Sequence, residues 1–190
     1  MNTQSDKWLK LEFQQNFDQL RYNDDKLTSL EKFFVAEVLG VIGVAIALYN
    51  KRFSESPRIS IAILVLFASI LGEIIYVWAI TIRKYFVLSA RQINSIRNYY
   101  VNLNSDEVRR FILLPTDSKH PVFINKSSSH LIALYLMNFI NSILFSSSIS
   151  FIVSTFKYFL CIKSLIIFSL LFIGLITNHM ILKFKLKENS

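Results

Sequence analysis

Hydrophobic positions along this chain gather into four long runs that are separated by polar segments. The runs cover roughly residues 33–49, 59–82, 131–156 and, starting at either 158 or 165, the stretch up to 182. Four runs approach the roughly 20 apolar residues that a helix needs to cross a bilayer core. The pattern predicts an all-α membrane protein with four transmembrane helices. Three is the alternative, because the first run is short and contains Glu37, while Lys163 interrupts the start of the fourth.

The polar segments beside the first two runs carry a helical periodicity. Apolar residues recur at steps of three or four at Leu9, Phe13, Phe17, Leu20, Leu27, Leu30 and Phe34. Residues 83–102 contain no Pro or Gly. Both segments are therefore expected to be helical extensions of the first and second spans. Loop-forming Pro and Ser residues follow up to residue 130, with one short helix expected at 107–114.

These patterns divide the chain into five parts. We expect a cytoplasmic amphipathic helix at 1–32, a first transmembrane hairpin at 33–82, a cytoplasmic helix and loop at 83–130, a second transmembrane hairpin at 131–182 and a basic cytoplasmic tail at 183–190.

Composition excludes an ordinary soluble domain. Of the 190 residues, 53% are hydrophobic and only 18% are charged, whereas soluble domains carry about 25% charged residues. The single cysteine, Cys161, excludes an intrachain disulfide. A disordered chain and a disulfide-rich secreted scaffold are both excluded by these values.

The basic residues are distributed unequally about the four runs. With four spans, 16 of the 21 Lys and Arg residues lie on the side of the two termini and the central loop, and 5 lie on the other side. The positive-inside rule then predicts a multi-pass bacterial inner-membrane protein with both termini in the cytoplasm. This bias accounts for most of the net charge of +8, so nucleic acid is not expected as a direct partner.

The two helical extensions place opposite charges at matching heights. Asp24 and Asp25 precede the first span by about as many residues as separate Arg91 and Arg97 from the end of the second. We expect an ion pair between these acids and one of the arginines. Solvated helix faces without a specific contact are the alternative.

Placing an ionisable side chain inside a membrane span costs free energy, so such residues in the apolar runs point to candidate functional sites. Glu73 falls near the middle of the second span, and Glu37 falls one turn inside the first. A carboxyl at such depth is expected to face protein or water, or to be protonated. Glu73 is either a protonated residue that packs between helices or part of a pore or ion pathway.

The third run carries a polar stripe. Asn138, Ser142, Ser146, Ser150 and Ser154 recur at steps of four, with Asn141 and Ser148 beside them. Close helix packing is the ordinary explanation of such small polar residues, and a wetted pore lining is the alternative. In the first run, the pairs Ala36/Gly40 and Gly43/Ala47 have the small-xxx-small spacing of helix association. One subunit offers too few helices to enclose a pathway, so a homo-oligomer in the lipid bilayer is expected.

No catalytic, cofactor or metal-binding motif is present, so an enzyme is not expected. The three histidines, His120, His130 and His179, are scattered. Arg97-Asn98 resembles the start of the Arg-polar-x3-His motif of HEPN-type RNases. The position of its histidine holds Asn102, which cannot act as a general base.

The segment LRYNDDKLTSLEKFF leads into the first span, and the segment RKYFVLSARQINSIRNYY follows the second span. In these segments the chain resembles small bacterial inner-membrane proteins that accompany phage-defence systems. Its four-span plan with a basic loop is similar to the accessory membrane proteins of type VI-B CRISPR loci. The resemblance covers roughly residues 10–115. It implies an effector that permeabilises or depolarises the inner membrane when a cytoplasmic defence protein signals infection. The alternative is a non-conducting membrane scaffold that recruits a cytoplasmic partner.

Overall fold

The computed structural model describes residues 3–51, 57–103, 119, 121–124, 128–153 and 160–185. Four helices occupy these ranges: α1 (Thr3–Lys51), α2 (Pro57–Leu103), α4 (Ser129–Val153) and α5 (Leu160–Lys185). The all-α prediction is therefore confirmed. The short helix expected at 107–114 and the stripe residue Ser154 lie outside the described residues.

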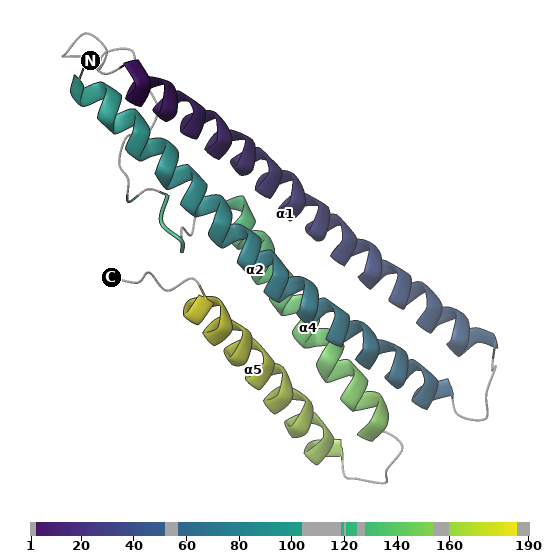
Figure 1. Cartoon of the computed structure of the whole chain (residues 1–190). Helices are drawn as coiled ribbons and strands as arrows, with labels where there is room; N and C mark the ends of the chain where they lie inside the picture. Colours follow the sequence, from purple (N-terminus) through teal and green to yellow (C-terminus); the bar gives the residue numbers. More distant parts are fainter. Residues whose placement is uncertain are drawn as a thin grey trace.

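Helices α1 and α2 are far longer than a membrane span. Their 49 and 47 residues correspond to about 73 Å and 70 Å at 1.5 Å per residue, against about 30 Å for the hydrocarbon core. Neither helix breaks where its apolar run meets its polar segment, so both polar segments are helical, and their cytoplasmic location stays a prediction. The two helices lie side by side and antiparallel (Figure 1).

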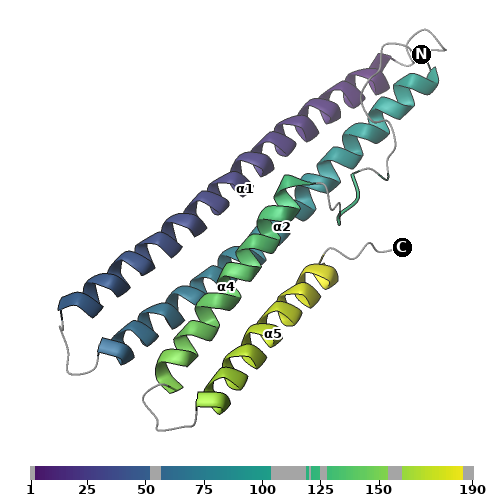
Figure 2. The same ribbon diagram turned by 180° about the vertical axis from the view of Figure 1, so that it is seen from behind.

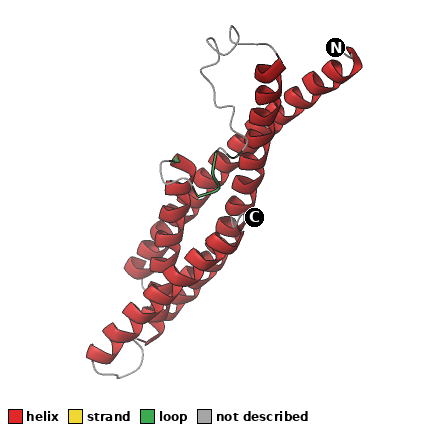
Figure 3. Ribbon diagram, turned by 90° about the vertical axis from the view of Figure 1, so that its left-hand side faces the viewer, coloured by secondary structure: helices red, strands yellow, loops and turns green. Residues whose placement is uncertain are grey.

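Each helix packs mainly on its neighbour in the chain: α1 on α2, α2 on α4 and α4 on α5 (Figure 2). Helices α4 and α5 accompany only part of α2, so the N-terminal part of α1 and the C-terminal part of α2 project beyond them as a two-helix stalk (Figure 3). On α1 the stalk precedes Asp24, whose side chain contacts His130 at the start of α4. In the stalk, the Tyr100 hydroxyl donates to the Asp6 carbonyl at 3.5 Å. The Arg97 guanidinium lies 5.7 Å from the centre of the Phe13 ring.

One apolar core joins all four helices near the base of the stalk. Its most completely buried side chains include Leu27 and Phe34 of α1, Tyr76 and Ile80 of α2, Leu131 and Leu134 of α4, and Leu182 of α5. Each contributes about 1.5–3 kcal/mol of transfer free energy when fully buried. This core fixes the relative heights of the helices on which the polar site described below depends.

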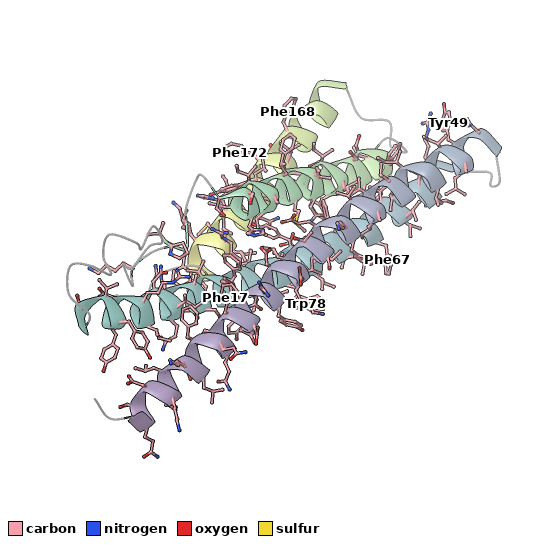
Figure 4. All side chains as sticks on the ribbon, turned by 90° about the horizontal axis from the view of Figure 1, so that it is seen from above. Phe17, Tyr49, Phe67, Trp78, Phe168 and Phe172 are labelled. Carbon is pink, nitrogen blue, oxygen red and sulfur yellow. The ribbon has the colours of Figure 1, made fainter. Side chains whose placement is uncertain are left out.

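Large apolar side chains also cover the outside of the bundle. Tyr49, Phe67, Trp78, Phe168 and Phe172 point away from the helices (Figure 4), and Phe168 is 75% exposed. Soluble proteins rarely expose apolar surface on this scale. Helices α1, α2 and α4 are long and apolar enough to cross a membrane, with mean hydropathies of 2.0, 2.3 and 1.6 over their most apolar segments. The described apolar segment of α5, Phe168–Phe184, is shorter. The chain is thus a membrane protein with three helices of spanning length.

Candidate intramembrane polar site

The carboxyl group of Glu73 connects three helices in the apolar part of the bundle. Asn141 of α4 donates from its Nδ2 to Glu73 Oε2 at 3.0 Å. Asn178 of α5 donates from its Nδ2 to the same oxygen, also at 3.0 Å. The Tyr76 hydroxyl donates to the Asn178 backbone carbonyl at 3.2 Å. This arrangement places Glu73 in contact with protein, as expected from the cost of a carboxyl group inside the membrane.

Gly72 allows Asn141 to approach α2 closely. A Cβ atom at this position would lie 2.6 Å from Asn141 Oδ1 and 3.1 Å from the Phe34 ring. Neither distance is compatible with an unshifted side chain. A larger residue beside Glu73 would therefore displace the Asn141 amide or the Phe34 ring.

Two buried oxygens of the site lack a hydrogen-bond donor among the described residues. They are Glu73 Oε1 and Asn141 Oδ1, and Asn141 is only 4% exposed. A cavity of about 300 Å³ adjoins them, with polar lining from Ser69, Glu73, Asn141, Ser142, Thr177 and Asn178. Unpaired buried acceptors cost about 1–3 kcal/mol each, so a ligand or water that donates to them would be stabilised here.

The polar stripe of α4 faces the other helices of the same subunit. Asn138, Ser142 and Ser146 are buried, whereas Ser150 is half-buried. Ser142 Oγ donates to Asn138 Oδ1 at 3.4 Å, and it lies 3.2 Å from the place of a Cβ on Gly174 of α5. Ser146 Oγ donates to the Ser142 carbonyl at 2.8 Å. These contacts favour helix packing for most of the stripe, with Ser142 also lining the cavity.

Glu37 does not line this cavity. It is half-buried on α1, and neither of its carboxyl oxygens has a hydrogen-bond partner among the described residues. Within the described ranges, no group of three or more His, Cys, Asp or Glu side chains is arranged to hold a metal ion.

Two arginines of α2 fasten the short segment 121–124 to the base of the stalk. Arg83 is 2% exposed, and its Nε and Nη2 donate to the Phe123 carbonyl at 3.3 and 3.1 Å. Its Nη1 donates to Ser128 Oγ at 3.0 Å. Arg91 Nε donates to the Pro121 carbonyl at 3.0 Å, and its guanidinium stacks on the Phe123 ring at 4.4 Å. Burial lowers the pKa of Arg83, but a guanidinium remains protonated at neutral pH.

The acidic residues of α1 meet a histidine at the start of α4. His130 Nε2 lies 2.8 Å from Asp24 Oδ1, and His130 Nδ1 lies 3.6 Å from Glu31 Oε1. Arg97 Nη1 donates to Asn94 Oδ1 at 3.2 Å, and its guanidinium lies over the Phe13 ring. The ion pair of Asp24 or Asp25 with Arg91 or Arg97 stays a prediction, and His130 is the partner that the described contacts give to Asp24.

The contact between Asp24 and His130 is expected to couple α1 to α4. Asp24→Asn and His130→Gln should each lower the free energy of unfolding, and the double variant should lose less than the sum of the two. The coupling energy should be on the order of 1 kcal/mol, because Asp24 is about half exposed. Chemical unfolding in detergent measures this cycle, and strict additivity would show that the pair contributes nothing.

Sequence reasoning missed several residues of the site. Asn178 was not singled out, although the neighbouring His179 was considered; His179 stacks on Tyr135 with a centroid distance of 6.1 Å. The sequence signal that could have identified Asn178 is its amide side chain, which lies inside an apolar run. Gly72 and Arg83 were not singled out, because their roles depend on which residue another helix brings near them.

No family model matches the chain, and neither a curated protein nor a solved structure is significantly similar to it.

Proposed function

We propose that this protein is an oligomeric inner-membrane effector that conducts cations and so depolarises the membrane in anti-phage defence. A cytoplasmic defence protein or signal controls it through the stalk. The observation that carries the proposal is the Glu73 carboxyl group, held by two amides from different helices beside a cavity with a mostly apolar lining. The defence setting rests on the resemblance in layout.

The depth of Glu73 supports a functional role. It lies within the apolar segment 59–82, where an acidic residue costs about 2.5–3.5 kcal/mol on insertion scales. Two hydrogen bonds to one oxygen offset part of this cost. The other oxygen has no donor among the described residues, so it remains available to a water or ligand in the cavity that Glu73 lines.

The proposed topology has four spans, with both termini and the central loop in the cytoplasm. The 16 to 5 distribution of basic residues supports it. Exposed apolar side chains along α5, including Phe172 and Phe184, support contact of this helix with lipid.

Reporter fusions test this topology. A periplasmic reporter fused at residue 55 should be active, and a cytoplasmic reporter fused at residue 190 should be active. The physical reason is the cost of moving the basic segments across the membrane. Cytoplasmic activity at residue 55, or periplasmic activity at residue 190, would reject the four-span arrangement.

In the proposed oligomer, helices from neighbouring subunits enclose the cation pathway, because one subunit has too few helices to do so. On α1, the small residues Ala36, Gly40, Gly43 and Ala47 are all exposed. No atom lies within 4 Å of a Cβ placed on either glycine. Such a face allows the close backbone approach that drives helix association in membranes, and a second copy of α1 is the proposed occupant.

The stalk and the segment 121–124 provide a route for control. Arg83 and Arg91 fasten this segment to α2, and α4 begins a few residues later at Ser129. A partner that displaces the stalk would therefore act on α4, which carries Asn141. This coupling is mechanical and requires no catalytic step.

A non-conducting scaffold is the second candidate function. It is favoured by exposed aromatic residues on the stalk, namely Trp8, Tyr22 and Tyr99, which suit a protein partner. A scaffold would recruit its partner without changing the membrane potential.

Depolarisation in cells separates the two functions. Expression of the wild-type chain should depolarise bacteria loaded with a potential-sensitive dye, and Glu73→Gln should abolish most of the effect because it removes the charge and keeps the shape. Glu12→Gln makes the same chemical change on the stalk and should behave as wild type. Equal depolarisation by the wild type and Glu73→Gln, at equal membrane levels, would remove Glu73 from the pathway.

A further inference from the structure

The structure has a further cavity at the level where the second and fourth apolar runs end. It has a volume of about 460 Å³ and is lined by Ile80, Thr81, Lys84, Tyr85 and Leu88 of α2 and by Phe184 of α5. The two apolar runs end at residues 82 and 182. The cavity therefore lies where the hydrocarbon core is expected to give way to lipid headgroups.

The lining of this cavity joins apolar surface to two groups that can donate hydrogen bonds. Its apolar part includes the side chain of Phe184, a residue that is 83% exposed. The Lys84 ammonium group and the Tyr85 hydroxyl have no hydrogen-bond or salt-bridge partner among the described residues. Thr81 differs, because its hydroxyl already donates to the Val77 carbonyl at 3.0 Å. The chemical complement of this lining is an amphiphile with an anionic head that accepts hydrogen bonds and an apolar chain.

The charged groups around the cavity are positive. Helix α5 contains no Asp or Glu, and α2 contains none in 74–103. Lys183 of α5 is exposed and adds a second positive charge to that of Lys84. On α1, the acids Asp24 and Glu31 contact a histidine of α4 and do not line the cavity. The two lysines therefore attract an anion to this surface.

From this combination we infer that the cavity binds an anionic phospholipid. Its phosphate accepts hydrogen bonds from the Lys84 ammonium group and the Tyr85 hydroxyl, and an acyl chain packs along Ile80 and the Phe184 ring. Basic pockets between transmembrane helices recognise anionic headgroups in this way. A zwitterionic headgroup is a poorer match, because its own ammonium group would lie near Lys84 and Lys183 without an acid to pair with.

A membrane lipid fits this position better than a soluble phosphate compound. A soluble anion would use the two donors but leave the apolar side of the cavity, around Phe184, in contact with water, a cost that an acyl chain removes. The lipid would also join α2 to α5 about one to two turns from the hydrogen bond between the Tyr76 hydroxyl and the Asn178 carbonyl. Lipid binding requires neither conduction nor a cytoplasmic partner, so this inference is independent of the proposed function.

Thermal unfolding of the purified full-length protein in a nonionic detergent tests the site. After removal of bound lipid, dioleoyl phosphatidylglycerol at ten times its Kd should raise Tm by about 3–6 °C. Phosphatidylcholine with the same acyl chains should give no comparable shift, and an equal shift from both lipids would overturn the inference. Glycerophosphoglycerol has the anionic headgroup without acyl chains and should give none. A shift from this compound equal to that from the lipid would replace the lipid site by a soluble phosphate site.

Variants of one lysine locate the binding in the cavity. Lys84→Gln removes the charge that faces the phosphate and should weaken the affinity for phosphatidylglycerol about fivefold or more. Lys84→Arg keeps the charge and should retain most of the affinity. Lys32→Gln is the matched control, because Lys32 is exposed and directly precedes the first apolar run but does not line the cavity. Its affinity should equal that of the wild type.

The same variants separate loss of binding from loss of folding. Without anionic lipid, all three should unfold at the wild-type Tm, because Lys84 and Lys32 are exposed. Equal affinities of the wild type and Lys84→Gln would overturn the site. Equal losses in Lys84→Gln and Lys32→Gln would also overturn it, since a general attraction between basic residues and anionic lipid would then explain the binding.

Discussion

Gly72→Ala is expected to destabilise the protein by about 1–3 kcal/mol, although alanine is the better helix former. The added methyl group would lie 2.6 Å from Asn141 Oδ1 and 3.1 Å from the Phe34 ring. Asn141 must then move away from α2, and Glu73 loses one of its two amide donors. Chemical unfolding in detergent measures the stability, and cation flux should fall together with it.

Gly43→Ala is the matched control for this substitution. Gly43 also lies in the apolar part of a long helix, but no atom lies within 4 Å of a Cβ placed there. Because Gly43 belongs to the proposed face between α1 helices, the comparison is made on monomeric protein in detergent, where the stability of Gly43→Ala should equal that of the wild type or exceed it slightly. If both variants were equally stable, the close contact between α2 and α4 at Gly72 would not exist.

Arg83→Met is expected to lower stability by about 1–3 kcal/mol. Methionine approximates the length of arginine but donates no hydrogen bond. The Phe123 carbonyl would lose two donors and Ser128 Oγ would lose one. The segment 121–124 would then be attached to α2 mainly through Arg91, so the start of α4 would be held less firmly.

Lys84→Met serves as the control, because it removes the same charge from the next residue of α2. Lys84 is exposed, and its substitution should change stability by less than about 0.5 kcal/mol. Thermal unfolding of both variants measures the difference. Comparable losses would show that charge, and not the contacts of Arg83, determines the effect.

The sequence determines the long helices more clearly than their contacts. Apolar periodicity through Phe13 and Phe17, and the absence of Pro and Gly from 83–102, predicted the helical extensions of α1 and α2. Glu73 could be recognised as unusual from the sequence alone, because an acidic residue in an apolar run is costly however its helix packs. Its partners Asn141 and Asn178 depend on the rotation and height of α4 and α5, which no local pattern specifies.

The partner of Asp24 illustrates the same limit at the base of the stalk. Matching heights on α1 and α2 made Arg91 and Arg97 reasonable partners for it. His130 lies 106 positions away in the sequence, after the segment that Arg83 and Arg91 fasten to α2. Its position beside Asp24 depends on how α4 packs against α1 and α2, which helix periodicity cannot reveal.

Cation flux from liposomes that contain the purified full-length protein tests the central claim most directly. Wild-type protein should release K⁺ down its gradient, and Glu73→Gln should reduce the rate at least about tenfold while cross-linking shows the same oligomer. A tenfold lower rate corresponds to a barrier for cation passage that is about 1.4 kcal/mol higher. Equal rates in both proteins, or no release from the wild type, would contradict a pore that depends on Glu73.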